Sequence, residues 1–525
     1  MAYVIGLDFG NYNTFPCFIS DIDFAKGRLG GIVHDLLPPE KQDGIPSAFF
    51  YSNKVKKTAT TKPLPWCGED AVGLQARPLK NRVRLLKRHL GEQINLDDKT
   101  FEYDEAITLV VQYCIRRANK VLKANWLTET NLVALSYPAT YTHAQRERLI
   151  KLVEKATLEN GTNVKVFGTI AEPAAAALDY LSGYVKKSEE TTVLTYDLGG
   201  GTFDLALVSA YPQGRKNAKG NTYYYDIINT RGIEDLGGSE FDDALYKLIL
   251  RLVGRTLKES QQREIFGKVE EAKKELTRNA ETVVEYFDSE IDDYEQILVT
   301  REQFEKETSS LVKKTIDKTK EILSEHKQQK PELILLTGGA SQMPMIRKEM
   351  EKAFPEYKGK IIDFRPTKAI AYGAARFGAV EESLEAKMER GNSSDSSPFQ
   401  QRTMYDLGIR FYRSLEDNEG YIDTYIKAGT EIPYESAEHG GRTQDYTRYL
   451  NYRVCEAIKS NPNTEKPSTD YKEIMNIELD HGKVVPPKTS SKTKLVIDKL
   501  GRLTVEGWTV EEPDKPLKKT IVLKM

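Results

Sequence analysis

Short apolar runs that lead into an aspartate or a glycine recur along the first three-quarters of the chain. Residues 4–7, 193–196 and 333–336 form such runs, and their length and composition predict buried strands. Between these runs, residues 106–124 carry apolar side chains at helical spacing and predict a long helix. Strands that alternate with helices in this way are typical of an α/β fold.

From Met404 onward the pattern changes to short strands separated by turns. The candidate strands in this part are 407–412, 421–426, 449–457, 474–479, 494–497, 503–506 and 520–524. A serine-rich stretch at 391–398 precedes them and is typical of a flexible linker. We therefore predict an α/β domain over 1–385, a flexible linker over 386–403 and an all-β domain over 404–525.

Composition narrows the class of protein. With 525 residues the chain is long enough for two or three domains, and its net charge of −2 gives no reason to expect nucleic acid or a membrane as a partner. The four cysteines are scattered and predict reduced thiols. No apolar run approaches the ~20 residues that span a bilayer. Asp8 interrupts any signal-like N-terminus, so we expect a cytoplasmic protein.

Candidate chemistry lies where two of the predicted strands end. Asp197 closes the run 193–196 and is followed by three glycines and Thr202, and Asp8 closes the run 4–7 and is followed by Gly10. Glycines can turn the backbone with positive φ and present bare N–H groups to a phosphate, while an aspartate can hold Mg²⁺ through water. The alternative is an ordinary glycine-rich turn between two strands.

A third strand also runs into glycines, at 333–341. Two Asp-x-Gly loops in one chain predict a duplicated fold that grips one phosphate chain from both sides, with a metal between Asp8 and Asp197. Single glycine motifs are weak signals, but three of them in one chain are unlikely to arise by chance.

Six segments resemble, in sequence and in order, the motifs of the seventy-kilodalton heat-shock chaperones, a family of the actin-like ATPase superfamily. The segments are 6–10, 171–178, 197–204, 236–242, 338–344 and 369–375. The resemblance implies an α/β, actin-like, ribonuclease-H-like duplicated ATPase of two lobes, followed by a C-terminal β-sandwich without a helical lid. It further implies ATP or ADP with Mg²⁺ between the lobes, and unfolded or extended peptide segments or a protein client as partner.

Residue by residue, the resemblance also implies a site. The catalytic set that it implies is Lys87, Glu172, Asp197 and Thr202, and the residues that it implies for the metal are Asp8 and Asp197. The residues that it implies for the nucleotide are Asp8, Gly10, Asn11, Tyr12, Gly199, Gly200, Gly201, Gly237, Gly238, Glu270, Lys273, Lys274, Thr277, Gly338 and Gly339.

Spacing alone favours simpler interpretations for several of these residues. Residues 82–91 read as a short helix with an exposed basic face, and only the resemblance places Lys87 at the γ-phosphate. Glu172 could be a plain charge at a helix N-terminus. The charged residues between 270 and 277 fit a solvated, salt-bridged helix face equally well.

The chain also departs from the family pattern. Ala340 and Gln342 stand where the family has serine and an adenine-stacking arginine, and Thr367 stands where it has aspartate. The linker lacks the leucine-rich docking patch, and Gly168 replaces an arginine, which weakens the expected coupling to a J-domain co-chaperone.

These departures keep alternatives open beside an ATP-dependent chaperone that hydrolyses ATP. One is a nucleotide-binding adaptor or co-chaperone of the same family with little ATPase activity. The others are a small-molecule kinase and a filament-forming relative within the superfamily.

Overall fold

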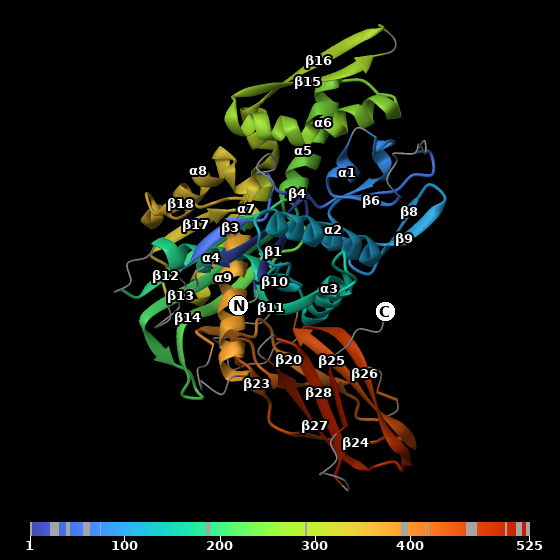
Figure 1. Cartoon of the computed structure of the whole chain (residues 1–525), viewed down its shortest axis with the longest axis vertical. Helices are drawn as coiled ribbons and strands as arrows, with labels where there is room; N and C mark the ends of the chain where they lie inside the picture. Colours follow the sequence, from blue (N-terminus) through green and yellow to red (C-terminus); the bar gives the residue numbers. More distant parts are fainter. Residues whose placement is uncertain are drawn as a thin grey trace.

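The chain forms two α/β lobes followed by a domain of strands (Figure 1). The computed structural model describes residues 3–20, 31–37, 43–55, 63–73, 75–184, 189–288, 291–389, 397–414, 416–417, 419–457, 470–498, 501–510 and 517–520. We call the part built on β1–β11 the first lobe, the part built on β12–β18 the second lobe, and the part from 404 onward the β-domain. The mixed α/β character predicted from the sequence is confirmed.

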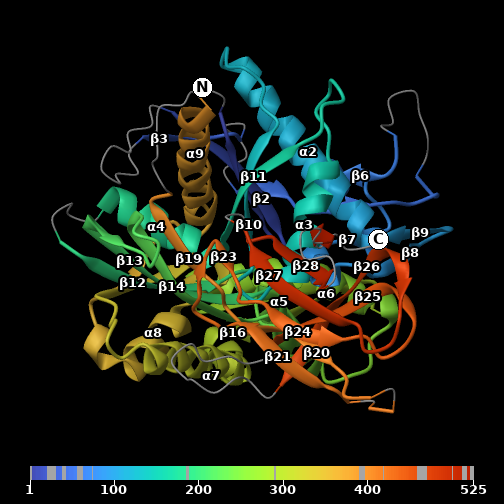
Figure 2. The same ribbon diagram turned by 90° about the horizontal axis from the view of Figure 1, so that it is seen from below.

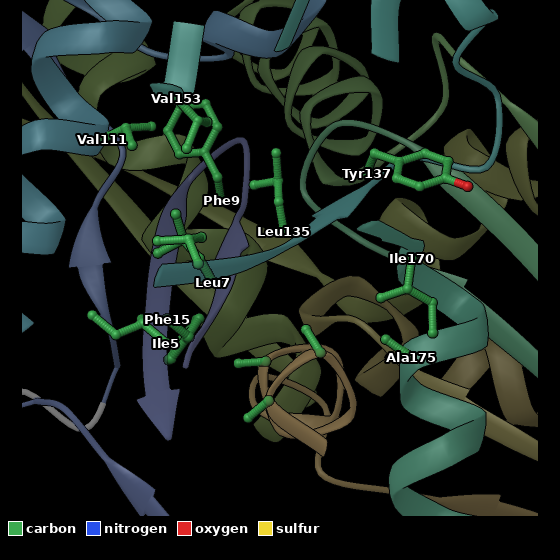
Figure 3. Packing of buried hydrophobic residues seen from close by; sticks show 14 of the residues in the cluster. Ile5, Leu7, Phe9, Phe15, Val111, Leu135, Tyr137, Val153, Ile170 and Ala175 are labelled. Atoms are coloured by element: carbon green, nitrogen blue, oxygen red, sulfur yellow. The ribbon is translucent and has the colours of Figure 1, made fainter. Parts of the chain in front are cut away.

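The first lobe is built on a sheet in the order β11-β10-β1-β2-β3, with β4 on β2. These strands are β1 (Ile5–Phe9), β2 (Asn13–Ser20), β3 (Ile32–Asp35), β4 (Ile45–Pro46), β10 (Leu132–Tyr137) and β11 (Lys165–Ala171). Strand β1 pairs antiparallel with β2 and parallel with β10. Every residue of β1 is buried because helices cover both faces of the sheet, and Figure 3 shows the packing around Leu7 and Leu135.

The second lobe repeats this topology in the order β18-β17-β12-β13-β14. Its strands are β12 (Thr191–Leu198), β13 (Phe203–Lys216), β14 (Thr222–Ile233), β17 (Leu333–Thr337) and β18 (Ile361–Asp363). Here β12 takes the place of β1, since it pairs antiparallel with β13 and parallel with β17. The ends of β1 and β12 carry Asp8 and Asp197, so the shared topology presents the two carboxylates in corresponding places.

Two helices lie between the sheets: α4 (Glu172–Tyr184), which packs on the second sheet, and α9 (Ala369–Glu389), which packs on the first. They cross so closely that a Cβ at Gly373 would fall on the backbone of Ala175. The alanines of α4 and the glycine of α9 are therefore a packing requirement, since larger side chains would hold the two lobes apart.

Outer helices flank the two lobes (Figure 2). The first sheet carries α2 (Tyr103–Ala124) and α3 (His143–Lys155). On the second lobe, α7 (Arg301–Glu325) packs on the sheet, and α5 (Gly238–Val253) and α8 (Pro344–Ala353) pack on α7. Helix α6 (Glu259–Arg278) packs on α5 and on the hairpin of residues 281–300. The helix predicted over 106–124 is confirmed. Within the described residues no helix has both the length and the apolarity that crossing a membrane requires.

The prediction of a helix over 82–91 is wrong for most of its length. Arg82–Val83 is a short strand, β7, and only Leu86–His89 forms a single 3₁₀ turn. Between them Leu85 adopts a left-handed conformation with φ of 57°, which no continuous helix allows.

Several small elements were not foreseen from the sequence. They are β5 (Phe49–Phe50), β6 (Trp66–Cys67), α1 (Glu69–Val72), β8 (Gln93–Leu96), β9 (Lys99–Glu102), β15 (Glu281–Asp288) and β16 (Asp293–Thr300). The four cysteines are buried and free of disulfide bonds, in agreement with the expected reduced thiols.

The prediction of a flexible linker over 386–403 is wrong at both ends. Helix α9 runs to Glu389, and Phe399–Arg402 form strand β19, which pairs parallel with β14. Phe399 is buried because it packs against Phe377 and Tyr225, with ring centroids 4.9 and 5.8 Å apart. The serine-rich residues 390–396 lie outside the described residues.

The β-domain consists of two antiparallel sheets around one apolar core. One sheet has the order β21-β20-β25-β26, with β20 (Leu407–Phe411), β21 (Tyr421–Ile426), β25 (Thr447–Ala457) and β26 (Tyr471–Val485). The other contains β23 (Tyr434–Glu435), β24 (His439–Arg442), β27 (Ser490–Ile497), β28 (Leu503–Thr509) and β29 (Leu517–Thr520). A short strand, β22 (Glu431–Ile432), pairs instead with β19. The part of the predicted last strand beyond 520 lies outside the described residues.

The close crossing of α4 and α9 generates a stability prediction. Gly373→Ala should lower the free energy of unfolding by about 3 kcal/mol, because the added methyl group collides with backbone atoms that cannot move aside. The matched control is Gly183→Ala in α4, where a Cβ would meet no atom of the described residues within 4 Å, so the substitution should be neutral or slightly stabilising. Chemical denaturation of the two variants checks this, and equal stabilities would contradict the packing argument.

Candidate functional site

A cleft of about 400 Å³ lies between the two lobes, and the predicted residues gather in it. The predicted residues that line it are Asp8, Gly10, Asn11, Tyr12, Lys87, Glu172, Asp197, Gly199, Gly200, Gly201, Thr202, Gly238, Glu270, Lys273, Lys274, Thr277, Gly338 and Gly339. Gly237 is not among the lining residues, because it packs against the backbone of Gly201.

The glycine loops come together by close approach of their backbones. We expected positive φ at residues 199–201, but among the cleft glycines only Gly338 adopts it, with φ of 80°. A Cβ at Gly200 would collide with the ring of Tyr12, and one at Gly201 would collide with the amide of Asn11. Glycine is required at 200 and 201 because the first lobe presses directly onto this loop.

Lys87 is buried deep in the cleft, opposite to the exposed face that its spacing suggested. The single 3₁₀ turn of residues 86–89 points it inward, and its Nζ donates to Oε1 of Glu172 at 2.5 Å. The two side chains are 2% and 7% exposed. A buried lysine of this kind is held by its carboxylate partner, and breaking such a pair leaves a costly uncompensated charge.

Three more carboxylates share this buried space. Burial first, and then the nearby charge of Glu172, raise the pKa of Asp8 to about 7. Burial, then the charge of Glu172, raises the pKa of Asp204 to about 7 as well. Burial, then the charge of Asp204, raises the pKa of Asp197 well above its usual range. The cleft therefore concentrates more negative charge than Lys87 can balance.

This acidic group has the chemistry of a site for a hard cation. Carboxylate oxygens of Glu172, Asp197 and Asp204 lie within 4.8 Å of one another, and Oδ1 of Asp197 accepts no hydrogen bond from the described residues. Oxygen-only donor sets suit Mg²⁺. Asp8 lines the same cleft but is not part of this group of three, so the residues present fit a cation near Asp197.

Sequence reasoning assigned no role to Asp204, although a signal for it existed. The hairpin of β12 and β13 pairs Asp197 with Asp204 directly across the two strands, so both side chains emerge on one face. If the two strands on either side of the glycine loop are paired as a hairpin, their register places the two carboxylates opposite each other. One oxygen of Asp204 accepts a hydrogen bond from the N–H of Ala139 at 2.8 Å, which ties it to the first lobe.

Contacts that cross from one lobe to the other also escaped prediction. The guanidinium of Arg88 donates to both oxygens of Glu240 at 2.7 and 2.8 Å and to the carbonyl of Gly201. Arg84 pairs with Glu270 at 3.1 Å. These residues are far apart in the sequence, so only the tertiary fold reveals that they close the cleft.

One further unforeseen contact joins the loop after β1 to the second lobe, and it continues into an ion pair within that lobe. The hydroxyl of Tyr12 donates to Asp242 at 3.3 Å, and Asp242 pairs with Lys273 at 2.8 Å. Residues of α6 thus line the cleft and also form ion pairs. The two interpretations of residues 270–277, as nucleotide-binding residues and as a salt-bridged helix face, therefore describe the same surface. The family departures Ala340, Gln342 and Thr367 line the cleft too.

These features define a class of protein: a two-lobed α/β chain whose lobes share one topology and enclose a cleft of glycine loops and buried carboxylates. A family model described as Hsp70 protein matches residues 78–457. The chain therefore belongs to the Hsp70 family.

Individual relatives support the same assignment. The chain is 27% identical over 409 residues to the Chaperone protein DnaK of Thermosipho africanus, a match that covers 73% of this chain and 60% of the relative. It is 25% identical over 550 residues to the Chaperone protein DnaK of Thermotoga petrophila, covering 96% of this chain and 86% of the relative. The protein of the same name from Thermotoga neapolitana matches to the same extent.

The raised pKa of Asp204 generates a prediction about stability and pH. Because its folded-state pKa of about 7 lies above the ordinary value of 3.8, the folded state holds the extra proton and loses stability as pH rises through this window. Asp204→Asn removes the charge and keeps the acceptor for Ala139. In the absence of divalent metal, the variant should have a higher free energy of unfolding than wild type. This difference should be larger at pH 8 than at pH 5 by on the order of 1 kcal/mol or more.

Denaturation midpoints at the two pH values measure this difference. The matched control is Asp317→Asn on α7, whose side chain is 57% exposed and whose effect should not change with pH. An Asp204→Asn effect that is the same at pH 5 and pH 8 would show that the carboxyl is not protonated in the folded protein.

Proposed function

We propose that this chain is an ATP-dependent chaperone that binds ATP with Mg²⁺ between its lobes, hydrolyses it and couples the cycle to its β-domain. The observation that carries the proposal is the buried Lys87–Glu172 pair beside the acidic group, within a cleft ringed by glycine loops. Membership of the Hsp70 family and relatives named Chaperone protein DnaK support it. ATP, ADP and Mg²⁺ are the ligands that this family membership leads us to expect.

The topology supports the corresponding architecture. The shared strand order of the two lobes fits an actin-like, duplicated ATPase domain over 1–385. The two packed sheets of the β-domain fit a substrate-binding β-sandwich. We propose these assignments on the strength of the strand orders and of the family to which the chain belongs.

Within this proposal each cleft residue has a task. Asp197 and Asp204, with Asp8 nearby, would hold the hydrated Mg²⁺, and a bound Mg²⁺ neutralises charge on the phosphate oxygens. The backbone N–H groups around 199–201 and Gly338 would hold the phosphates. Lys87, which pairs with Glu172, would also donate a hydrogen bond to the γ-phosphate. Glu172 and Thr202 would orient the attacking water. The oxygen of water then bonds to the γ-phosphorus as the bond to ADP breaks.

The β-domain is the proposed site for a partner. We propose that it binds extended apolar peptide segments or a protein client, as the names of the relatives suggest for proteins of this family. Its interior core is well packed, with Leu407, Val454 and Leu495 fully buried, so a stable platform exists for such binding.

A second candidate function is a nucleotide-binding adaptor with little ATPase activity. It is favoured by Gln342 and Thr367, which line the cleft where the family has an arginine and an aspartate. Tight Mg·ATP binding without measurable turnover by the wild-type protein would support the adaptor. A small-molecule kinase and a filament-forming relative fit the β-domain and the family membership less well.

The role of Lys87 generates the central kinetic prediction. Lys87→Ala should slow hydrolysis by about 10²-fold or more while ADP affinity stays near normal, because the lost charge acts mainly on the transition state. Single-turnover hydrolysis and ADP titration measure the two quantities. The control is Lys120→Ala on α2, whose side chain is 56% exposed and does not line the cleft, so turnover should change little. Wild-type turnover in Lys87→Ala would remove Lys87 from the catalytic set.

A further prediction concerns peptide exchange. The linker strand contributes one buried aromatic residue, Phe399, followed by the polar Gln400 and Gln401, so little apolar surface is available to transmit nucleotide state. We expect weak, rapidly exchanging binding of extended apolar peptides that ATP shifts only slightly, because coupling free energy acts equally in both directions. Stopped-flow release of a labelled peptide in ATP and in ADP tests this. Slow release in ADP with strong acceleration by ATP would contradict it.

A further inference from the structure

One aromatic side chain of the first lobe crosses the cleft and lies against the glycine loop of the second lobe. Tyr12 follows β1 and is among the residues that line the cleft. A Cβ at Gly200 would collide with the tyrosine ring, so the ring packs directly on the backbone of that loop. The proposed hydrolysis assigns no task to this ring.

The loop that carries Tyr12 is fixed to the first lobe through its backbone. The N–H of Ser47 donates to the carbonyl of Tyr12 at 2.8 Å, and the N–H of Leu85 donates to the carbonyl of Asn11 at 3.3 Å. Because the backbone is held at two successive residues, we expect the ring to move together with the first lobe.

The far end of the ring is held by the second lobe. The Tyr12 hydroxyl donates to Asp242 on α5 at 3.3 Å, and Asp242 pairs with Lys273 on α6 at 2.8 Å. Burial, and then the charge of Asp242, raise the pKa of Tyr12 above its usual value, so the hydroxyl remains a donor at neutral pH. Tyr12 therefore joins the two lobes both by packing and by a hydrogen bond.

An ion pair between the lobes supports the same ring. The guanidinium carbon of Arg84 lies 5.4 Å from the centroid of the Tyr12 ring, within the range of a cation–π contact. Arg84 also pairs with Glu270 on α6 at 3.1 Å. Among the described residues that line the cleft, Tyr12 and Glu270 are present but Arg84 is not, so the guanidinium supports the ring from outside.

The proposed function places the phosphates of a nucleotide between the loop at 10–12 and the loop at 199–201. Phosphates that are held in this way cannot leave while the two loops touch. We propose that Tyr12 is a gate residue: its ring must move off Gly200 before a nucleotide enters or leaves the cleft. This inference rests on the proposed function for the identity of the ligand, and it adds the side chain that limits exchange. Contacts that break on opening raise the barrier in both directions, so they slow association as well as release.

Stopped-flow exchange of a fluorescent Mg·ADP analogue measures the gate on the full chain. Tyr12→Ala removes the ring and its hydroxyl. Association and release should both become faster by about tenfold or more, because the burial of an aromatic side chain contributes on that scale. Tyr12→Phe keeps the ring and loses only the bond to Asp242, so both rates should rise about threefold. Faster release in Tyr12→Ala with association at the wild-type rate would overturn the proposal, because Tyr12 would then only contact the ligand.

Tyr51→Phe is the matched control for the hydroxyl. The Tyr51 hydroxyl donates to Asp98 at 3.3 Å, which is the same distance and the same kind of acceptor, but both residues belong to the first lobe and neither lines the cleft. Both rates should equal those of wild type. The same acceleration in Tyr51→Phe as in Tyr12→Phe would overturn a role that is specific to the gate.

Hydrogen exchange without nucleotide tests the gate separately from the proposed function. In Tyr12→Ala we expect the backbone N–H groups of residues 199–202 to exchange faster than in wild type, because the ring no longer covers them. Exchange in the neighbouring strand β12 should not change, which distinguishes the opening of the gate from a general loss of stability. A wild-type protein that binds no ADP would overturn the proposed function, whereas unchanged exchange at 199–202 would overturn the gate itself.

Discussion

The whole arrangement depends on one electrostatic constraint: the buried carboxylates of Asp8, Glu172 and Asp197 line one cleft, with buried Asp204 within 4.8 Å of the last two, and Lys87 pairs with Glu172. Charged groups removed from water are costly unless they are paired, so the pKa of the aspartates rises and protons substitute for missing cations. A divalent cation carried by a polyphosphate would relieve the same cost. We interpret the acidity of the cleft as the feature that makes it receptive to a metal-bound nucleotide.

The fold brings these charges together by repeating one topology. Strands β1 and β12 occupy equivalent central positions, and both end in the cleft with an aspartate. The helices α4 and α9 can cross between the sheets only because Ala175 and Gly373 allow their backbones to touch. Glu172 at the start of α4, three residues before Ala175, pairs with Lys87. Tight packing at the helix crossing therefore determines the geometry of charges at the cleft.

The sequence predicted the strands that end in Asp8 and Asp197 because short apolar runs and glycines are local signals. It did not reveal why Gly200 and Gly201 are glycines, since the atoms that exclude a Cβ belong to residues 11 and 12. Asp204 was not predicted as a site residue because its position beside Asp197 depends on strand register. The contact of Arg88 with Glu240 was not predicted because the two residues lie 152 positions apart.

The linker was misjudged for a similar reason. A single Phe399 among polar residues carries little local signal, yet Phe377 and Tyr225 surround it in the fold. The resulting strand connects β22 of the β-domain to the sheet of the second lobe. The residues of this attachment do not line the cleft.

Calorimetric titration of ATP with and without Mg²⁺, on the wild-type protein and on Asp197→Asn, tests the central claim most directly. We predict that wild-type binding depends strongly on Mg²⁺, that it releases protons near pH 7 as the raised carboxyls ionise, and that Asp197→Asn loses most of the metal dependence. ATP binding that is equally tight with and without Mg²⁺, or unchanged in Asp197→Asn, would contradict the account of the cleft as a site for a metal-bound nucleotide.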